Sequence, residues 1–149
     1  MRWEMKISIE EIPRGEEEEI IIRCHEMNEE VMALLHKLKS SGEQLSGICG
    51  DEIYRLRLSD IYYFETVDQK SFLYGENRVY ETKLKLYEFE ELAAGTRFFR
   101  ASKSTVINAG KISHIKPSLS GRFEAFMDNG EKLLVSRSYV PSLKKVLGL

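Results

Sequence analysis

The dipeptide Asn129-Gly130 is the feature that most restricts how this chain can fold. It follows the segment Arg122–Met127 and precedes the segment Glu131–Ser136, both of which have strand-like sequences. Asn-Gly favours the tight turns that connect antiparallel strands, because both central residues of such turns have positive φ angles. The two segments therefore predict a β-hairpin and, with it, an antiparallel sheet.

Residues 44–149 contain further short strand signals of the same kind. Alternating, aromatic or β-branched stretches occur at Glu52–Leu58, Ile61–Val67, Phe72–Tyr74, Val79-Tyr80, Phe98-Phe99 and Ile112–Lys116. A helix is expected from Leu86 to Ala93, with Gly95 just past its end, and a second short helix from Tyr139 to Leu147. The segment is therefore predicted to be mainly β, with short helices and no βαβ alternation.

Residues 1–43 have a different texture and are expected to form a small β-β-α appendage. Alternation over Met5–Ile9 and the apolar run Ile20–Ile22 indicate two strands. A helix follows, because Met27, Val31, Leu34, Leu35 and Leu38 recur at helical spacing. Ser40-Ser41-Gly42 ends that helix, so we place a domain boundary between residues 43 and 44. The appendage could dimerise, pack on the β domain or bind an inhibitor.

Composition narrows the class of protein. The 149 residues are 42% hydrophobic, which is enough for a folded core, and no apolar run approaches the roughly 18 residues that span a bilayer. The first residues have no apolar core of a signal peptide, so a cytoplasmic location is expected. Cys24 and Cys49 are accordingly expected to be buried free thiols.

Charge is distributed unevenly along the chain. Residues 1–43 hold six Lys/Arg against eleven acids, a balance of -5, whereas residues 97–149 hold ten against three, a balance of +7. Clustered cations release counterions from phosphates, so the basic end suggests a polyanionic partner. The alternative is that these cations only keep exposed strand faces soluble.

Sequence signals of catalysis and cofactor binding are lacking. The glycines are scattered singly and form no phosphate-binding loop, and Cys24-His25-Glu26 has no second pair of ligands at zinc spacing. No nucleophile motif accompanies the three histidines. We therefore expect no enzyme activity, no metal, no cofactor and no small-molecule substrate.

The stretch from Phe98 to Leu147 carries the specific signal. It contains Phe99-Arg100-Ala101-Ser102-Lys103-Ser104, then Val106-Ile107-Asn108, then Asn129-Gly130 leading into Ser136-Arg137. Together with the upstream strand Asp60–Glu65, this series resembles the LytTR-type DNA-binding domain of bacterial transcriptional regulators over about residues 44–149. The resemblance implies an elongated antiparallel β fold whose loops, rather than a recognition helix, enter successive major grooves of double-stranded DNA.

The resemblance also implies partners and contact residues. Members bind paired promoter repeats as dimers on the DNA, and some short members are restrained by a small membrane protein. The residue types at the corresponding loops point to Lys70 or Ser71, Ser102 with Lys103, and Arg137. Many members carry histidine where Ser102 stands. The roughly 43 residues before the β domain are too few for a phosphoacceptor receiver domain.

Residue chemistry agrees with that interpretation and leaves alternatives open. Arg137 can read guanine with its planar fork, whereas phosphate or surface roles suit the cations Arg100, Lys111, Lys116 and Arg122. Arg100 could instead pair with an acid, Arg137 with Glu131 or Asp128, and Asn108 could cap a turn. A single-stranded nucleic-acid binder and a protein-binding β module are the competing functions.

Overall fold

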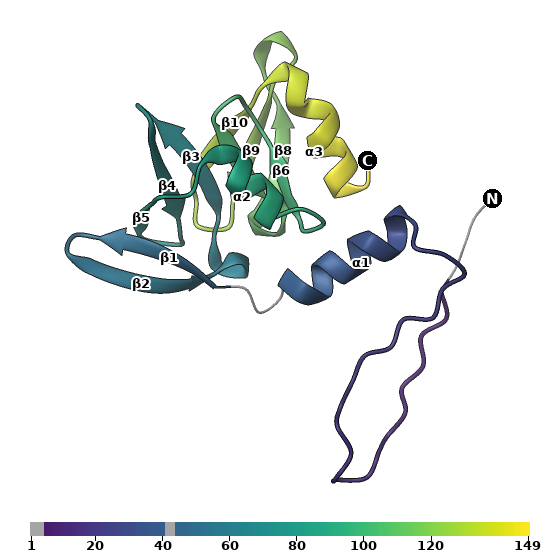
Figure 1. Cartoon of the computed structure of the whole chain (residues 1–149). Helices are drawn as coiled ribbons and strands as arrows, with labels where there is room; N and C mark the ends of the chain where they lie inside the picture. Colours follow the sequence, from purple (N-terminus) through teal and green to yellow (C-terminus); the bar gives the residue numbers. More distant parts are fainter. Residues whose placement is uncertain (1–4, 41–43) are drawn as a thin grey trace.

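The structure, a computed structural model, describes residues 5–40 and 44–149. Its strands form one sheet of seven, in the order β2-β1-β5-β4-β3-β7-β6, and one of three, in the order β10-β9-β8 (Figure 1). Every neighbouring pair is antiparallel. The expected class, mainly antiparallel β with short helices, is confirmed.

Most elements after residue 50 lie where the sequence signals place them, whereas β1 and β7 had no such signal. The larger sheet comprises β1 (Gln44–Cys49), β2 (Glu52–Arg57), β3 (Tyr63–Val67), β4 (Lys70–Tyr74), β5 (Val79–Thr82), β6 (Phe98–Arg100) and β7 (Thr105–Asn108). The smaller sheet comprises β8 (Ile112–Pro117), β9 (Phe123–Met127) and β10 (Lys132–Val135). The helices are α1 (Glu29–Ser40), α2 (Leu86–Leu92) and α3 (Val140–Leu147).

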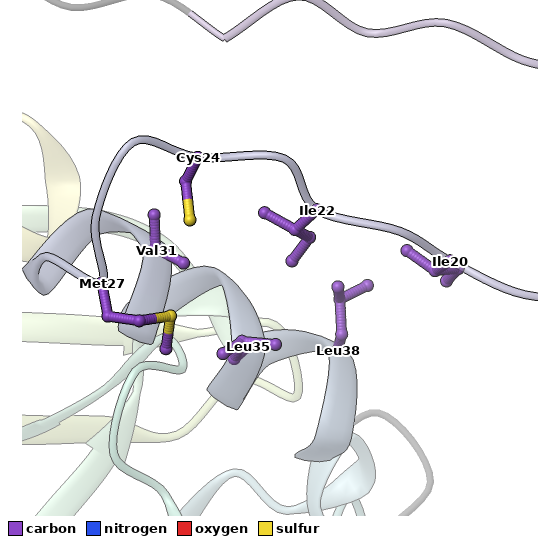
Figure 2. Close-up of a pocket in the computed structure, with 7 residues that line it drawn as sticks. All are labelled: Ile20, Ile22, Cys24, Met27, Val31, Leu35 and Leu38. Atoms are coloured by element: carbon purple, nitrogen blue, oxygen red, sulfur yellow. The ribbon is translucent and has the colours of Figure 1, made fainter.

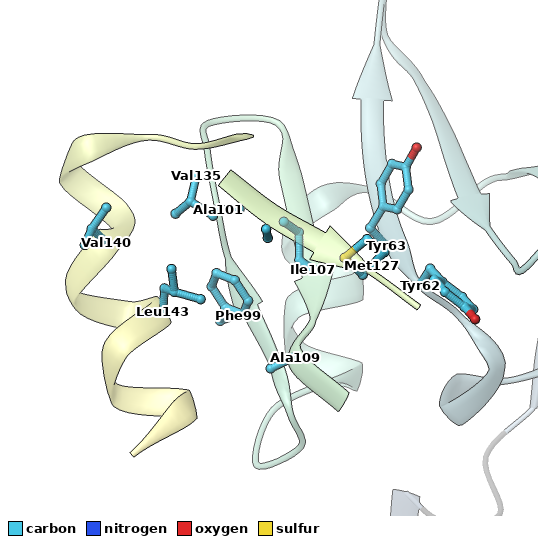
Figure 3. Close-up of a cluster of buried hydrophobic side chains, with 11 residues drawn as sticks. Tyr62, Tyr63, Phe99, Ala101, Ile107, Ala109, Met127, Val135, Val140 and Leu143 are labelled. Atoms are coloured by element: carbon cyan, nitrogen blue, oxygen red, sulfur yellow. The ribbon is translucent and has the colours of Figure 1, made fainter. Parts of the chain in front are cut away.

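Strands β3 and β7 lie between two hydrophobic cores. On one face Phe64 and Val106 pack with Phe89 of α2, and the Phe64 and Phe89 rings stack with centroids 4.6 Å apart. On the other face Tyr63 and Ile107 belong to the core that the smaller sheet and α3 complete (Figure 3). Both faces of these strands are therefore apolar, and each fully buried aromatic or aliphatic side chain contributes about 1.5–3 kcal/mol to folding.

The predicted hairpins are present. Met127 and Glu131 close the β9–β10 turn, in which Gly130 has a φ of 90°. The β4–β5 connection is closed by Gly75 N–H donating to the Arg78 carbonyl at 2.8 Å. The local sequence therefore suffices to fix these two pairings.

Helix α1 forms as expected and rests on the β domain. Asn28 caps it, because its Oδ1 accepts the Val31 N–H at 2.9 Å. Val31 is buried, and the helix surface at His36 meets Gly95, three residues past the end of α2. A Cβ added to Gly95 would lie 2.8 Å from that of His36, so only glycine fits there without a shift.

Two expectations for the first 40 residues are wrong. Residues 5–28, including the predicted strands at Met5–Ile9 and Ile20–Ile22, contain no assigned strand, because their backbones find no ladder partner in the described part of the chain. The β-β-α appendage is therefore extended coil followed by α1. Cys24 and Cys49 are free thiols as expected, but Cys24 is exposed and Cys49 half-buried. No helix within the described ranges is long and apolar enough to cross a membrane.

Candidate nucleic-acid interface

Four connections meet at one end of the two sheets. Strands β3, β6, β8 and β10 end there, and β4, β7 and β9 begin there, because all neighbours are antiparallel. Figure 1 shows the β8–β9 loop beside the start of α3 at this end. We call it the loop edge and define it as residues 67–70, 101–105, 117–122 and 136–139. Of the residues proposed from the sequence as DNA contacts, it contains or adjoins all but Lys111: Lys70, Ser71, Arg100, Ser102, Lys103, Lys116, Arg122 and Arg137.

Backbone hydrogen bonds hold these connections together. Thr66 N–H donates to the Ser104 carbonyl at 2.9 Å, which joins the end of β3 to the β6–β7 loop. Ser136 N–H donates to the Ala101 carbonyl at 2.9 Å, which joins the end of β10 to the same loop. The β6–β7 loop is therefore the centre of the loop edge, and its neighbours have fixed positions relative to it.

Arg137 projects from the junction of β10 and α3. Its side chain is exposed and its aliphatic part lies against Gly121, where an added Cβ would come within 2.9 Å of Arg137 Cδ. The guanidinium has no hydrogen bond or ion pair with any described residue, and Glu131 and Asp128 lie at the other end of the hairpin. The alternative in which Arg137 pairs with one of those acids is therefore absent from this structure, and its donors remain available to a ligand.

Arg100 is used inside the protein. Its Nη1 contacts Glu90 Oε1 of α2 at 2.8 Å, while Nε and Nη2 donate to the carbonyls of Ser102 and Lys103, each at 2.6 Å. The guanidinium also lies 5.8 Å from the ring centroid of Tyr139. The alternative in which Arg100 pairs with an acid is confirmed. Its hydrogen bonds to the two loop carbonyls hold the β6–β7 loop in its conformation.

Within the β6–β7 loop held by Arg100, the side chain of Lys103 is exposed and that of Ser102 is not. Ser102 is half-buried, and its hydroxyl accepts the Ser104 N–H at 3.2 Å, so this side chain stabilises the turn. Lys103 is exposed and gives the loop only its carbonyl, which leaves the ammonium group directed to solvent.

Lys70 and Ser71, at the start of β4, differ in how accessible their side chains are. Asp68 and Gln69 both have left-handed backbones, with φ of 50° and 66°, which makes the two-residue turn that suits strand twist. Lys70, the first residue of β4, is exposed, whereas Ser71 is only 9% exposed between Thr66 and Thr82. A ligand at the loop edge can reach Lys70 far more easily than Ser71.

Lys116 and Arg122 flank the β8–β9 loop. Lys116 is exposed opposite Glu124, and the Glu124 carboxylate is engaged by Lys132 at 3.7 Å. Arg122 is exposed, and its Nε donates to the Leu119 carbonyl at 3.3 Å. Lys111, by contrast, lies over the Tyr62 ring at the other end of the sheets. The loop edge thus gathers Lys70, Lys103, Lys116, Arg122 and Arg137.

Acidic groups gather at the end opposite the loop edge. There Asn129 Nδ2 donates to the Glu76 carbonyl at 3.0 Å and links the β9–β10 turn to the β4–β5 turn. Burial, and next the Glu131 carboxylate, raise the pKa of Tyr63, while burial, then Glu76 and Asp128, raise that of Tyr62. Glu76, Asp128 and Glu131 therefore lie at the end opposite the loop edge, which itself carries five exposed cations, while other exposed cations such as Arg78 and Lys132 lie elsewhere on the domain.

The competing sites proposed from the sequence find less support. Phe64, Phe99 and Tyr62 are buried in the two cores and cannot serve as stacking platforms for single-stranded bases. Asn108 is a turn cap, since its Oδ1 accepts the Gly110 N–H and its Nδ2 donates to the Ile61 carbonyl, both at 2.9 Å. Within residues 5–40 and 44–149 no cluster of three or more metal-ligating side chains occurs.

Sequence reasoning missed three residues that shape this surface. Glu90 holds Arg100 from a helix, Tyr139 lies beside the same guanidinium, and Gly121 makes room for Arg137. Only Gly121 had a local signal, as the glycine after Ser120 in a loop between two strands. Nothing in the spacing of Glu90 and Arg100 points to their contact, because a helix end and a loop separate them.

A strand-rich domain whose rigid loops present a basic edge belongs to the class of nucleic-acid-binding β modules. The LytTr DNA-binding domain model matches residues 51–148, so the chain belongs to the LytTR family. A solved LytTr DNA-binding domain of a methyl-accepting/DNA response regulator from Bacillus cereus superposes with a TM-score of 0.67 at 31% identity, covering 71% of this chain and 97% of that one.

Two curated relatives differ in how much of them the chain covers. It is 31% identical over 99 residues to the sensory transduction protein LytT of Enterococcus faecalis, which is 66% of this chain but only 41% of that protein. It is 24% identical over 147 residues to an uncharacterized HTH-type transcriptional regulator of Staphylococcus aureus, covering 97% of this chain and 99% of that one. At 97% of the chain, the second similarity includes most of the first 43 residues.

Proposed function

We propose that this chain is a transcriptional regulator that binds double-stranded DNA through the loop edge. The observation that carries the proposal is the convergence of Lys70, Lys103 and Arg137 on one rigid surface, fixed by the Thr66–Ser104 and Ser136–Ala101 hydrogen bonds. Preformed loops lower the entropy cost of binding, and exposed cations supply the phosphate attraction. Family membership and the regulator named among the relatives support the same conclusion.

The roles of the cations follow from their settings. Arg137 has a free planar fork on a rigid stem and is the residue we assign to a base edge in a major groove. Lys103 and Lys70 reach the adjoining groove, while Lys116 and Arg122 contact phosphates and fix the register. Ser102 and Arg100 act by holding the loop, and Ser71 supports the β3–β4 turn from inside.

The remaining parts of the proposal concern assembly and location. Two copies bind paired promoter repeats, and binding takes place in the cytoplasm, where bacterial promoters are. Residues 44–149 form the DNA-binding domain, and residues 1–43 serve dimerisation or regulation. Restraint by a small membrane protein is proposed on the family resemblance alone.

A competition experiment tests the proposal. Duplex from the promoter region of the protein's own gene, labelled at one end, is competed with unlabelled copies, random duplex and the separated strands. We expect the promoter duplex to compete at least about a hundredfold better than random duplex. The double variant Lys103→Glu/Arg137→Glu should lose binding, whereas Lys111→Glu at the opposite end should not. Equal competition by random duplex, or a preference for single strands, would refute the proposal.

A further inference from the structure

The segment of residues 5–11 has a strand-like sequence but no pairing partner in the described part of the chain. Met5, Ile7 and Ile9 alternate with Lys6, Ser8 and Glu10, yet Ile7 and Ile9 are 90% and 92% exposed. Residues 5–12 make no hydrogen bond to any described residue. An alternating extended segment with a free edge is a template for pairing with another strand.

The sequence of this segment is complementary to itself. In an antiparallel pair centred on Ser8, Ile7 of each copy faces Ile9 of the other, and Lys6 of each copy faces Glu10 of the other. Directly opposed side chains have Cβ atoms about 4.5–5.5 Å apart, close enough for apolar contact and charge attraction. Both pairs occur twice, as a two-fold axis requires.

Other registers lose this match. A parallel, in-register pair would oppose Lys6 to Lys6 and Glu10 to Glu10. An antiparallel pair centred on Ile9 would place Lys6 opposite Ile12 and Ile7 opposite Glu11. An antiparallel pair centred on Ile7 would keep apolar pairs but oppose Lys6 to Ser8 and lose both charge pairs. In the register centred on Ser8 the one mismatch, Met5 opposite Glu11, lies at the ends of the ladder. Since like or unmatched pairs within a ladder destabilise it, the register centred on Ser8 is favoured.

Neighbouring apolar groups enlarge the surface. Ile20 and Ile21, in the segment that leads to α1, are also exposed. Figure 2 shows that Ile20, Ile22 and Cys24 line a groove of about 360 Å³ together with Met27 and the α1 residues Val31, Leu35 and Leu38. Nine of the sixteen exposed large hydrophobic side chains in the described ranges lie in residues 5–38, so this region gains most from burial.

We propose that residues 5–11 of two copies pair as antiparallel strands about Ser8 and make the chain a homodimer. A second copy is the occupant that fits, because this segment supplies both the apolar and the charged complement of itself. A two-stranded ribbon alone is only marginally stable, so burial of exposed apolar side chains such as Ile20 and Ile21 in the dimer is expected to add to the pairing. The pairing is independent of DNA and leaves both loop edges free.

A charge exchange in the full chain tests the pairing. Lys6→Glu and Glu10→Lys each replace two opposite-charge pairs by two like-charge pairs, and the double variant Lys6→Glu/Glu10→Lys restores both. By sedimentation equilibrium we expect the dimer dissociation constant to rise about tenfold in each single variant and to return to near the wild-type value in the double variant. A wild-type monomer at about 100 µM, or a double variant as weak as the two singles combined, would overturn the proposal.

A crosslinking series tests the register. In a Cys24→Ser/Cys49→Ser background, Ser8→Cys should oxidise to a disulfide-linked dimer, because facing residues lie within disulfide reach. Lys6→Cys should not, whereas Lys6→Cys with Glu10→Cys should. Crosslinking of Lys6→Cys as readily as Ser8→Cys would contradict the register. Arg137→Ala should dimerise like the wild type, so a failure of DNA binding is distinguished from a failure of this pairing.

Discussion

Nη1 of Arg100 lies 2.8 Å from Oε1 of Glu90, so helix α2 holds the side chain that in turn holds the β6–β7 loop. The other guanidinium nitrogens are used by two loop carbonyls. The hydrogen-bond donors of Arg100 are therefore used by groups of the same protein, although Arg100 lies in the middle of a basic surface. Its proposed contribution to DNA binding is to place Lys103.

Removing that guanidinium should weaken binding without removing a DNA contact. Arg100→Ala should lower the free energy of unfolding by about 1–2 kcal/mol, because the carbonyls of Ser102 and Lys103 lose their donors. It should weaken the affinity for promoter duplex by more than this stability loss explains, since Lys103 loses its fixed position. Glu90→Gln keeps the carbonyl bonds and should cost less than about 1 kcal/mol.

Thermal melting and promoter-duplex titrations of the wild type and both variants check this prediction. If Arg100→Ala binds the promoter as tightly as the wild type at a temperature where both are folded, the positioning role is wrong.

Arg137 should govern specificity. Arg137→Ala should cost about 1–3 kcal/mol on the promoter site and much less on random duplex, because the phosphate contacts remain. Arg137→Lys should also lose discrimination, since an ammonium lacks the planar fork. Melting temperatures should stay near the wild-type value, because Arg137 has no polar partner within the described chain. Titrations of both duplexes measure the ratio, and an unchanged ratio excludes base reading by this residue.

Salt dependence should separate the two ends of the domain. With about four to eight phosphate contacts per protomer, log affinity should fall with log salt at a slope of roughly -4 to -7. Lys116→Ala should weaken all duplexes equally and reduce the slope by about one. Lys111→Ala is the matched control and should leave the slope unchanged, because Lys111 stacks on Tyr62 away from the loop edge. A slope near zero with tight binding contradicts an interface built on phosphates.

Replacement by alanine should destabilise the protein more at Gly95 than at Gly50. Both have positive φ, 77° and 65°, so either change to alanine costs about 1 kcal/mol of backbone strain. The added Cβ at Gly95 would also meet His36 at 2.8 Å, whereas Gly50 has open space around it. Chemical denaturation should therefore give a larger loss for Gly95→Ala than for Gly50→Ala. Equal losses would mean that α1 does not rest on the turn after α2 in solution.

Alkaline pH should destabilise the fold through the buried tyrosines. Burial and nearby carboxylates raise the pKa of Tyr63 and Tyr74 in the folded state, whereas in the unfolded chain tyrosines titrate near about pH 10. Above that pH the unfolded state loses protons that the folded state keeps, so the free energy of unfolding falls as pH rises. Denaturation of Tyr63→Phe between about pH 9 and 11 should show a shallower decline than the wild type; an identical decline would assign the effect to other groups.

The sequence predicted the hairpins because their signals are local. Asn129-Gly130 lies between two strand-forming segments, and the resulting β9–β10 pair is as expected. Strand β1 carried no comparable signal, since Ser46 and Gly47 interrupt its apolar pattern. Gly47 has a tertiary reason: an added Cβ would lie 2.6 Å from Cβ of Tyr80 on β5.

The candidate site was predictable in part for the same reason. Lys103 and Arg137 stand in stretches with a recognisable order of residues, and both are exposed on the loop edge. The Asp68-Gln69 turn lacks glycine, so the local sequence did not predict that both residues have a left-handed backbone. The strands expected at Met5–Ile9 and Ile20–Ile22 failed because alternation reports only the tendency to pair, and the partner must come from elsewhere.

The pairing of β3 with β7 has a consequence for how the protein folds. Every other strand pairing in the β3–β10 region joins two strands connected by a single turn, but β3 and β7 bring Glu65 to Thr105 from 40 positions away. Closing so long a loop is slow compared with forming a hairpin. Since the Thr66–Ser104 bond belongs to that closure, we expect a chain emerging from the ribosome to complete its hairpins first and to assemble the loop edge only when this ladder forms.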